Sequence, residues 1–137
     1  MDKVKVSDKL LLSVEKPARY TGGELNSIVK ETVRLRFALC FPDVYEIGMS
    51  HLGSRILYEV INSREEYACE RCFAPWPDME KAMRENNVPM FTLETRTPLA
   101  ECDIVGFSLL YEMCYTNILT MLDLAHIHKR SADRGEN

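Results

Sequence analysis

The chain has 137 residues, of which 46% are hydrophobic and 28% charged, as is typical of one soluble globular domain. Its net charge of −4 argues against a nucleic-acid-binding surface, which requires clustered basic side chains. No apolar run approaches the roughly 18 residues of a membrane span, and the N-terminus lacks the apolar core of a signal peptide, so we expect a cytoplasmic protein.

The first 33 residues are charged and mixed in character, and they are interpreted as an N-terminal extension. Residues 7–14 are expected to form one or two helical turns, with Ser7 as a capping residue. The segment Tyr20-Thr-Gly-Gly-Glu24 has the composition of a turn.

The first strand is predicted over residues 34–41, because the run after Arg36 is almost continuously apolar, as in a strand buried on both faces. A short loop with Asp43, Tyr45 and Gly48 follows, and Ser50 is the expected N-cap of a helix that extends to about residue 63. The apolar residues that recur there at helical spacing are Leu52, Ile56, Leu57, Val60 and Ile61.

The second half of the chain continues the alternation of strands and helices. A second strand is predicted over 67–74, ended by Pro75, and a helix begins near Asp78 and stops at residues 86–87. We expect a short peripheral strand at 90–93 and a helical turn after Thr97. The predictions end with a third main strand at 104–109 and an amphipathic helix at 115–127.

This order of elements predicts an α/β domain over residues 34–130, with a parallel sheet, helices on both faces and right-handed crossovers. The fold class is a flavodoxin-like (Rossmann-like) doubly wound sheet with the strand order 2-1-3, truncated after the third main strand and its helix; residues 131–137 form a tail. The third strand would then be an exposed sheet edge, which favours pairing with another chain. We therefore expect the chain to self-associate.

Candidate binding residues follow the first and third strands, at the sheet edge where doubly wound proteins hold ligands. Asp43, Tyr45 and Gly48 form an Asp-x-Tyr-x-x-Gly pattern, and Ser108 and Leu110 form Ser-x-Leu about sixty residues later. A purely structural interpretation of the first pattern is that Asp43 satisfies backbone donors and Gly48 permits a turn.

Four longer segments carry a resemblance to a known family. They are Pro17-Ala-Arg-Tyr-Thr-Gly-Gly-Glu-Leu-Asn26, Phe41-Pro-Asp-Val-Tyr-Glu-Ile-Gly-Met-Ser-His-Leu-Gly53, Phe73-Ala-Pro-Trp-Pro-Asp78 and Asp103-Ile-Val-Gly-Phe-Ser108. Over residues 16–134 the chain resembles the N-terminal cobalamin-binding-type domain of the B12-binding radical SAM proteins. The resemblance implies a cobalamin at Asp43, Tyr45, Gly48, Ser108 and Leu110. It also implies a partner barrel domain, absent from this chain, that binds a [4Fe-4S] cluster and S-adenosylmethionine.

Tyr45 stands where cobalamin-binding domains with a histidine ligand have Asp-x-His-x-x-Gly. A phenol has an ordinary pKa near 10 and stays protonated at neutral pH, so it is a poor cobalt ligand. We therefore expect cobalamin to bind without histidine ligation. The alternative is a degenerate, non-catalytic domain that has lost cobalamin and serves packing or protein contact. His51 is expected to be a capping or surface residue rather than the missing ligand.

The five cysteines are an odd number scattered over predicted strands and a helix start, which does not indicate a secreted disulfide framework. Cys69 and Cys72 have the Cys-x-x-Cys spacing, but no second pair follows, and a strand places positions i and i+3 on opposite faces. The radical SAM motif Cys-x-x-x-Cys-x-x-Cys is absent from the sequence. We assign no catalytic residue and no metal ligand, and we expect radical SAM catalysis only in the parent protein.

Other doubly wound families fit the sequence less well. A receiver domain would have an aspartate at the end of the third strand, and this strand ends Phe107-Ser-Leu-Leu. The loop after the first strand is too acidic and bulky for a flavodoxin phosphate loop, and Gly-x-Gly-x-x-Gly is missing.

Overall fold

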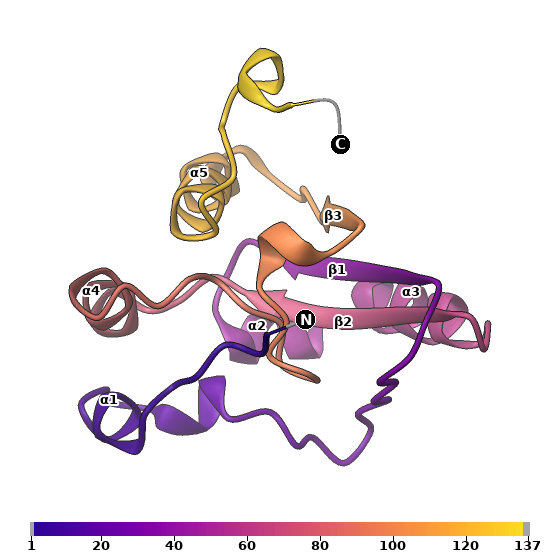
Figure 1. Cartoon of the computed structure of the whole chain (residues 1–137), viewed down its shortest axis with the longest axis horizontal. Coiled ribbons are helices and arrows are strands. Elements are labelled where there is room, and N and C mark those ends of the chain that lie inside the picture. Colours follow the sequence, from indigo (N-terminus) through magenta and orange to yellow (C-terminus); the bar gives the residue numbers. More distant parts are fainter. Residues whose placement is uncertain (1, 136–137) are drawn as a thin grey trace.

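The computed structural model describes residues 2–135, so the end of the predicted tail, residues 136–137, lies outside the described part. Three parallel strands form one sheet: β1 (Leu35–Phe41), β2 (Tyr67–Phe73) and β3 (Ile104–Phe107). Their order is β2-β1-β3, as expected for a truncated doubly wound sheet (Figure 1). Phe41 pairs with Phe73 and Cys40 with Phe107, so the strands end at one common edge.

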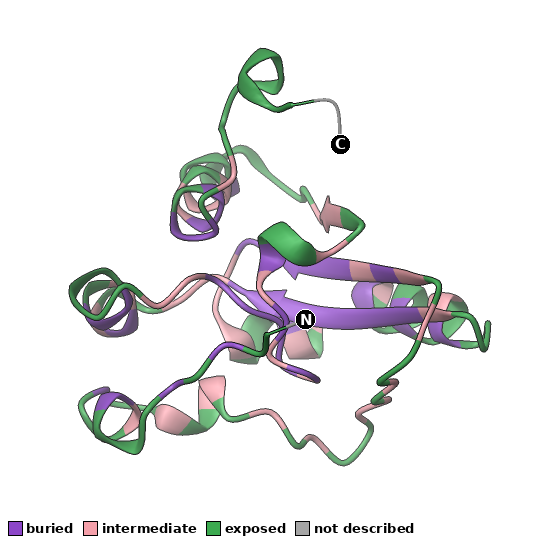
Figure 2. Ribbon diagram, viewed as in Figure 1, coloured by how far each residue is buried: buried purple, intermediate pink, exposed green. Residues whose placement is uncertain are grey.

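The two faces of the sheet are covered differently. Alternation along β1 places Leu39 in the core under α3 (Leu52–Asn62), and Ala38 and Cys40 in the larger core on the other face. Buried side chains from α1 (Asp8–Leu12), α4 (Pro77–Glu85) and α5 (Tyr115–Leu124) complete that larger core. Figure 1 shows these three helices grouped on the left, and α3 on the right. β1 and β2 are buried along most of their length, and β3 is not (Figure 2).

The N-terminal segment packs into the larger core. Ser7 caps α1, because its hydroxyl accepts a hydrogen bond of 3.2 Å from the backbone N–H of Leu10. Val4, Val6 and Val14 are buried with Leu10 among residues of the sheet and of α4 and α5. Short 3-10 helices at Pro17–Tyr20, Leu99–Glu101, Glu112–Cys114 and Ser131–Asp133 connect the main elements.

The predicted loop after β1 is wrong, because a helix forms there. α2 (Tyr45–Ser50) has Val44 as its N-cap residue, so only Pro42, Asp43 and Val44 lie between the strand and the helix. Ser50 is therefore the last residue of α2 rather than the N-cap of α3. The N-cap is His51, whose Nδ1 accepts a hydrogen bond of 3.1 Å from the backbone N–H of Ser54, so the expectation of a capping histidine is confirmed.

The predicted strand at 90–93 is also wrong. This segment forms one antiparallel bridge, between Phe91 and Pro98, and Leu93 donates its N–H to the carbonyl of Arg71 at 2.9 Å. The third strand ends at Phe107 instead of residue 109, and the last helix ends at Leu124 instead of residue 127. The helix stops because His126 takes a positive φ of 57° and Ile127 donates back to the carbonyl of Leu122.

Two buried ion pairs involve charged residues of the strands, and they help to hold residues 92–95 against β2. Glu70 in β2 is fully buried; it pairs with Arg36 in β1 and accepts hydrogen bonds from the hydroxyls of Thr92 and Thr95. On the face that α3 covers, Arg71 pairs with buried Glu94 at 2.7 Å. These contacts hold the irregular segment after α4 against the strands. Among the described residues, none of the helices has the length and apolar character that crossing a membrane requires.

Candidate functional site

The two segments that carry the candidate binding residues meet at the carboxyl edge of the sheet. The N–H of Ser108 donates to the carbonyl of Cys40 at 3.0 Å, so the segment after β3 continues alongside the end of β1. The phenol of Tyr111 then donates to the carboxylate of Asp43 at 3.3 Å. The segment that contains Asp43 and the segment that contains Ser108 therefore lie side by side at this edge, as the doubly wound topology predicts.

Asp43 also has a local structural role. Its carboxylate accepts a hydrogen bond of 2.7 Å from the N–H of Val44, the residue before α2. It lines a cavity of about 220 Å³ at the sheet edge, together with Glu80, Asn117 and Thr120. The amide of Asn117 donates to the carbonyl of Pro42 at 2.9 Å. The cavity has both polar and apolar walls.

Ser108 and Leu110 lie on the other side of this edge. The hydroxyl of Ser108 is 3.5 Å from that of Ser54 in the first turn of α3. Leu110 is 53% exposed, and it belongs to a segment, residues 109–115, that exposes five large apolar side chains. These are Leu109, Leu110, Tyr111, Met113 and Tyr115.

Tyr45 is directed toward the N-terminal segment instead. Its ring packs edge-on against Phe73 at 5.6 Å between centroids, and it lines two cavities formed with Arg19 and neighbouring residues of the N-terminal segment. Burial, with a smaller contribution from a hydrogen bond to Glu24, raises the pKa of Tyr45 to about 12. The phenol is therefore protonated at neutral pH.

Gly48 packs closely against the strand ends. It is buried in α2, and a Cβ at this position would overlap the ring of Phe73 and lie 3.2 Å from that of Phe41. Glycine is required because the helix crosses over these two rings. The ring of Phe73 occupies the space directly beside Gly48, and both residues also line a larger cavity.

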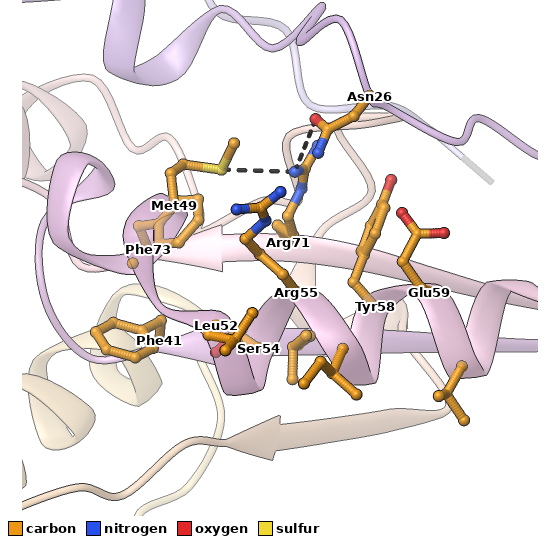
Figure 3. Close-up of a pocket in the computed structure, with 14 residues that line it drawn as sticks. Asn26, Phe41, Met49, Leu52, Ser54, Arg55, Tyr58, Glu59, Arg71 and Phe73 are labelled. Atoms are coloured by element: carbon orange, nitrogen blue, oxygen red, sulfur yellow. Dashed lines mark hydrogen bonds between the residues drawn. The ribbon is translucent and has the colours of Figure 1, made fainter.

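A larger cavity, of about 360 Å³, runs along α3 (Figure 3). Its walls are mostly apolar and include Gly48 at one end, and its polar lining residues include Asn26, Ser54, Arg55, Glu59 and Arg71. The guanidinium of Arg71 lies 4.4 Å from the ring centroid of Tyr58 and donates to Asn26 at 3.3 Å. Arg71 is not among the residues predicted from the sequence, although an arginine inside an apolar strand run is a signal for a buried, paired charge.

Tyr45 is the residue that departs from the cobalamin arrangement of the histidine-type domains. It carries a protonated phenol that faces the N-terminal segment, whereas Gly48 lines the cavity along α3. Asp43 and Ser108 share an edge, and Asp43 lines a second cavity there. Among residues 2–135, no group of three or more His, Cys, Asp or Glu side chains is arranged to hold a metal ion.

Cys69 and Cys72 lie on opposite faces of β2, as the strand alternation predicts. Cys69 belongs to the core under α3, and Cys72 belongs to the larger core on the other face. Burial raises the pKa of the Cys69 thiol to about 12, and the carboxylate of Glu94 adds to this shift. Cys69 is therefore a protonated thiol in the core at neutral pH.

Comparison with known proteins gives a family match. A family model described as "Radical SAM proteins, N-terminal" matches residues 53–137, which is more than half of the chain. The match includes Ser108 and Leu110 and begins after Gly48. No curated protein and no solved structure matches the chain.

Proposed function

Because this chain belongs to the family of N-terminal domains of radical SAM proteins, we propose that it is a non-catalytic module that docks against a radical SAM barrel through the carboxyl edge of its sheet. The barrel would carry the [4Fe-4S] cluster and S-adenosylmethionine. The observation that carries the proposal is the run of exposed apolar side chains in residues 109–115, directly after β3. Exposed apolar surface of this extent is typical of contact sites.

Two further features support this edge as the contact surface. Trp76 follows β2 at the same edge, is 45% exposed and lies under the guanidinium of Arg19 at 5.2 Å. Tyr111 is fixed in direction by its hydrogen bond to Asp43. Aromatic residues held in place at a partly apolar surface are the usual anchors of protein contacts, because little conformational entropy is lost when they bind.

The experiment is a binding titration of the chain against a purified barrel polypeptide that carries Cys-x-x-x-Cys-x-x-Cys and is encoded in the same genome. Met113 is 78% exposed, and we expect Met113→Asp to weaken binding at least about tenfold. Leu12→Asp is the matched control, because Leu12 is 80% exposed on α1. Equal affinities of the Met113→Asp variant and the unchanged chain would overturn the proposal.

A second candidate function is cobalamin binding without histidine ligation at the same edge. The observation in its favour is that the segments containing Asp43 and Ser108 lie side by side. A ligand that bridges the ends of β1 and β3 requires this arrangement. The direction of Tyr45, which faces the N-terminal segment, favours the docking module instead.

A titration with hydroxocobalamin, followed by its visible spectrum, separates the two functions. We expect no spectral shift at micromolar ligand. A shift that disappears in both Asp43→Ala and Ser108→Trp would establish cobalamin binding. If the bound cobalamin then lacks the spectrum of a histidine-ligated cobalt, this agrees with a tyrosine at position 45 instead of histidine. Ser131→Trp serves as the control, because Ser131 is exposed in a separate 3-10 helix.

A further inference from the structure

α3 places its polar side on the sheet and its apolar side toward solvent. Ser54, Tyr58 and Asn62 are 8%, 2% and 7% exposed, and they face the strands. The amide of Asn62 makes two hydrogen bonds of 3.0 Å with the backbone of Cys69, and Tyr58 accepts one of 2.7 Å from the N–H of Ile28. These bonds fix the rotation of the helix about its axis.

The opposite side of α3 is an unpaired apolar row, which we call the α3 stripe. Leu52, Ile56 and Val60 follow one another at four-residue spacing and are 65%, 53% and 60% exposed, and Leu57 beside them is 47% exposed. Leu52, Ile56 and Val60 also line the cavity that runs along α3. An amphipathic helix normally turns such a row inward, so an outward row indicates a contact surface.

The two charged residues beside the α3 stripe, Arg55 and Glu59, have opposite charges and could pair with the same residues of a second copy of the helix. Arg55 and Glu59 are exposed, lie one helical turn apart and line the same flank of the stripe, where Figure 3 shows both side chains on one side of α3. Among residues 2–135, neither forms an ion pair with another side chain. A second identical helix that runs antiparallel would therefore bring Arg55 of each copy to Glu59 of the other.

We propose that the α3 stripe is a homodimer interface in which two α3 helices pack antiparallel about a twofold axis near Ile56. Leu52 of one copy then meets Val60 of the other, and Ile56 meets its own equivalent. The two Arg55–Glu59 contacts lie on one side of the seam, and Leu57 extends the apolar contact on the other. The α3 stripe begins at Leu52, next to the carboxyl edge of the sheet, where the hydroxyl of Ser54 lies 3.5 Å from that of Ser108, and it extends away from that edge along α3.

The first test is sedimentation equilibrium of the full chain from about 10 μM to 1 mM. Four apolar side chains a side correspond to the lower end of specific interfaces, so we expect a dissociation constant on the order of 0.1 mM. Ile56→Arg would place two like charges at the axis and should give monomer throughout this range. Leu12→Arg, on exposed α1, and Met113→Asp, on the carboxyl edge, should dimerise like the unchanged chain.

The second test is a charge exchange, which distinguishes this interface from non-specific association. Arg55→Glu and Glu59→Arg should each weaken the dimer about tenfold, because each places like charges across the axis twice. The double variant Arg55→Glu/Glu59→Arg should return to within about threefold of the original affinity. Circular dichroism checks that every variant keeps its helix content.

The outcomes decide between the possible occupants of the surface. Monomer at all concentrations for the unchanged chain overturns the proposal. A dimer that Ile56→Arg leaves intact, or a double variant that stays weak, overturns it as well and points to another surface, such as the open edge of β3. Loss of the dimer in Ile56→Arg, together with recovery in the charge exchange, supports it.

Discussion

Gly48 on α2 and Phe73 at the end of β2 pack so closely that a side chain at position 48 would overlap the aromatic ring. This contact joins the helix after β1 to the neighbouring strand, at the position where the sequence suggested a ligand cradle. The glycine therefore serves close packing of the protein against itself, and this packing can be measured.

Gly48→Ala should destabilise the fold by about 1–3 kcal/mol, because the added methyl group forces α2 away from Phe73. Urea unfolding followed by circular dichroism measures the change. Gly48→Ala combined with Phe73→Leu should cost less than the sum of the two single variants, since the smaller side chain vacates the space. Gly135→Ala, where a Cβ meets nothing within 4 Å, is the control and should have almost no effect. A Gly48→Ala variant as stable as the unchanged chain would contradict this packing.

Glu70→Leu should destabilise the protein by about 3–5 kcal/mol, because it leaves the charge of Arg36 buried without its partner. Replacing both residues, as Arg36→Met with Glu70→Leu, should recover much of this loss, since no buried charge remains. The measurement is again urea unfolding.

The exposed pair of Lys81 and Glu85 provides the contrast for this experiment. Their side chains are 76% and 62% exposed, so Glu85→Leu should change the free energy of unfolding by less than about 0.5 kcal/mol. A double variant no more stable than Glu70→Leu alone would show that the pair does not act as a unit.

The free energy of unfolding should change little between about pH 7 and 8 and should fall between about pH 9 and 12. Burial raises the pKa of Cys69 from 9.0 to about 12 and does the same for Cys102. Above pH 9 the unfolded chain releases these protons while the folded chain keeps them, so alkali favours unfolding. Tyr58, whose pKa burial raises from 10.0 to about 12, adds to the decline above pH 10.

For fully buried Cys69 the decline amounts to about 1.4 kcal/mol for each pH unit in this window. Unfolding in urea at pH 7.5, 9 and 10, under reducing conditions, measures the slope. Cys69→Ala should reduce the slope, with the contributions of Cys102 and Tyr58 remaining, whereas Glu85→Leu should leave it unchanged. Equal slopes for Cys69→Ala and the unchanged chain would show that Cys69 does not carry the effect.

Asn62→Leu should destabilise the protein by about 2–3 kcal/mol, because it leaves the N–H and carbonyl of Cys69 without their partners under α3. Hydrogen exchange should show faster exchange of the Cys69 amide. Asn86→Leu is the control, since Asn86 lies in an exposed position at the end of α4. Unchanged protection at Cys69 would contradict the role of Asn62.

The strands and their order follow from local and topological rules. The apolar runs at β1 and β2 and the helix signals between them are strong enough to predict a parallel sheet in the order 2-1-3. The same rules predict that Asp43 and Ser108 reach one edge, because the ends of parallel strands coincide. The positions of Cys69 and Cys72 on opposite faces of β2 follow from strand alternation in the same way.

The errors arise where long-range contacts outweigh local signals. Residues 45–50 were expected to be a loop because Gly48 suggests a turn, but the ring of Phe73, which is distant in sequence, accepts a close helix there. Residues 90–93 have the composition of a strand, yet Glu70 and Arg71 hold the segment through Thr92 and Leu93 in an irregular path. Neither partner is visible in a local window of the sequence.

The sequence by itself determined the class of fold, the strand order and the pair of segments that meet at the sheet edge, because hydrophobic periodicity and chain connectivity fix these properties. Only the tertiary structure decided that Tyr45 faces the N-terminal segment, that Phe73 fills the space at Gly48 and that α3 turns its apolar row outward. The physical reason is that side-chain direction depends on which hydrogen bonds and rings a distant segment supplies. For α3, the bonds of Asn62 and Tyr58 to the backbones of β2 and the N-terminal segment outweigh the preference of its leucine and isoleucine side chains for burial.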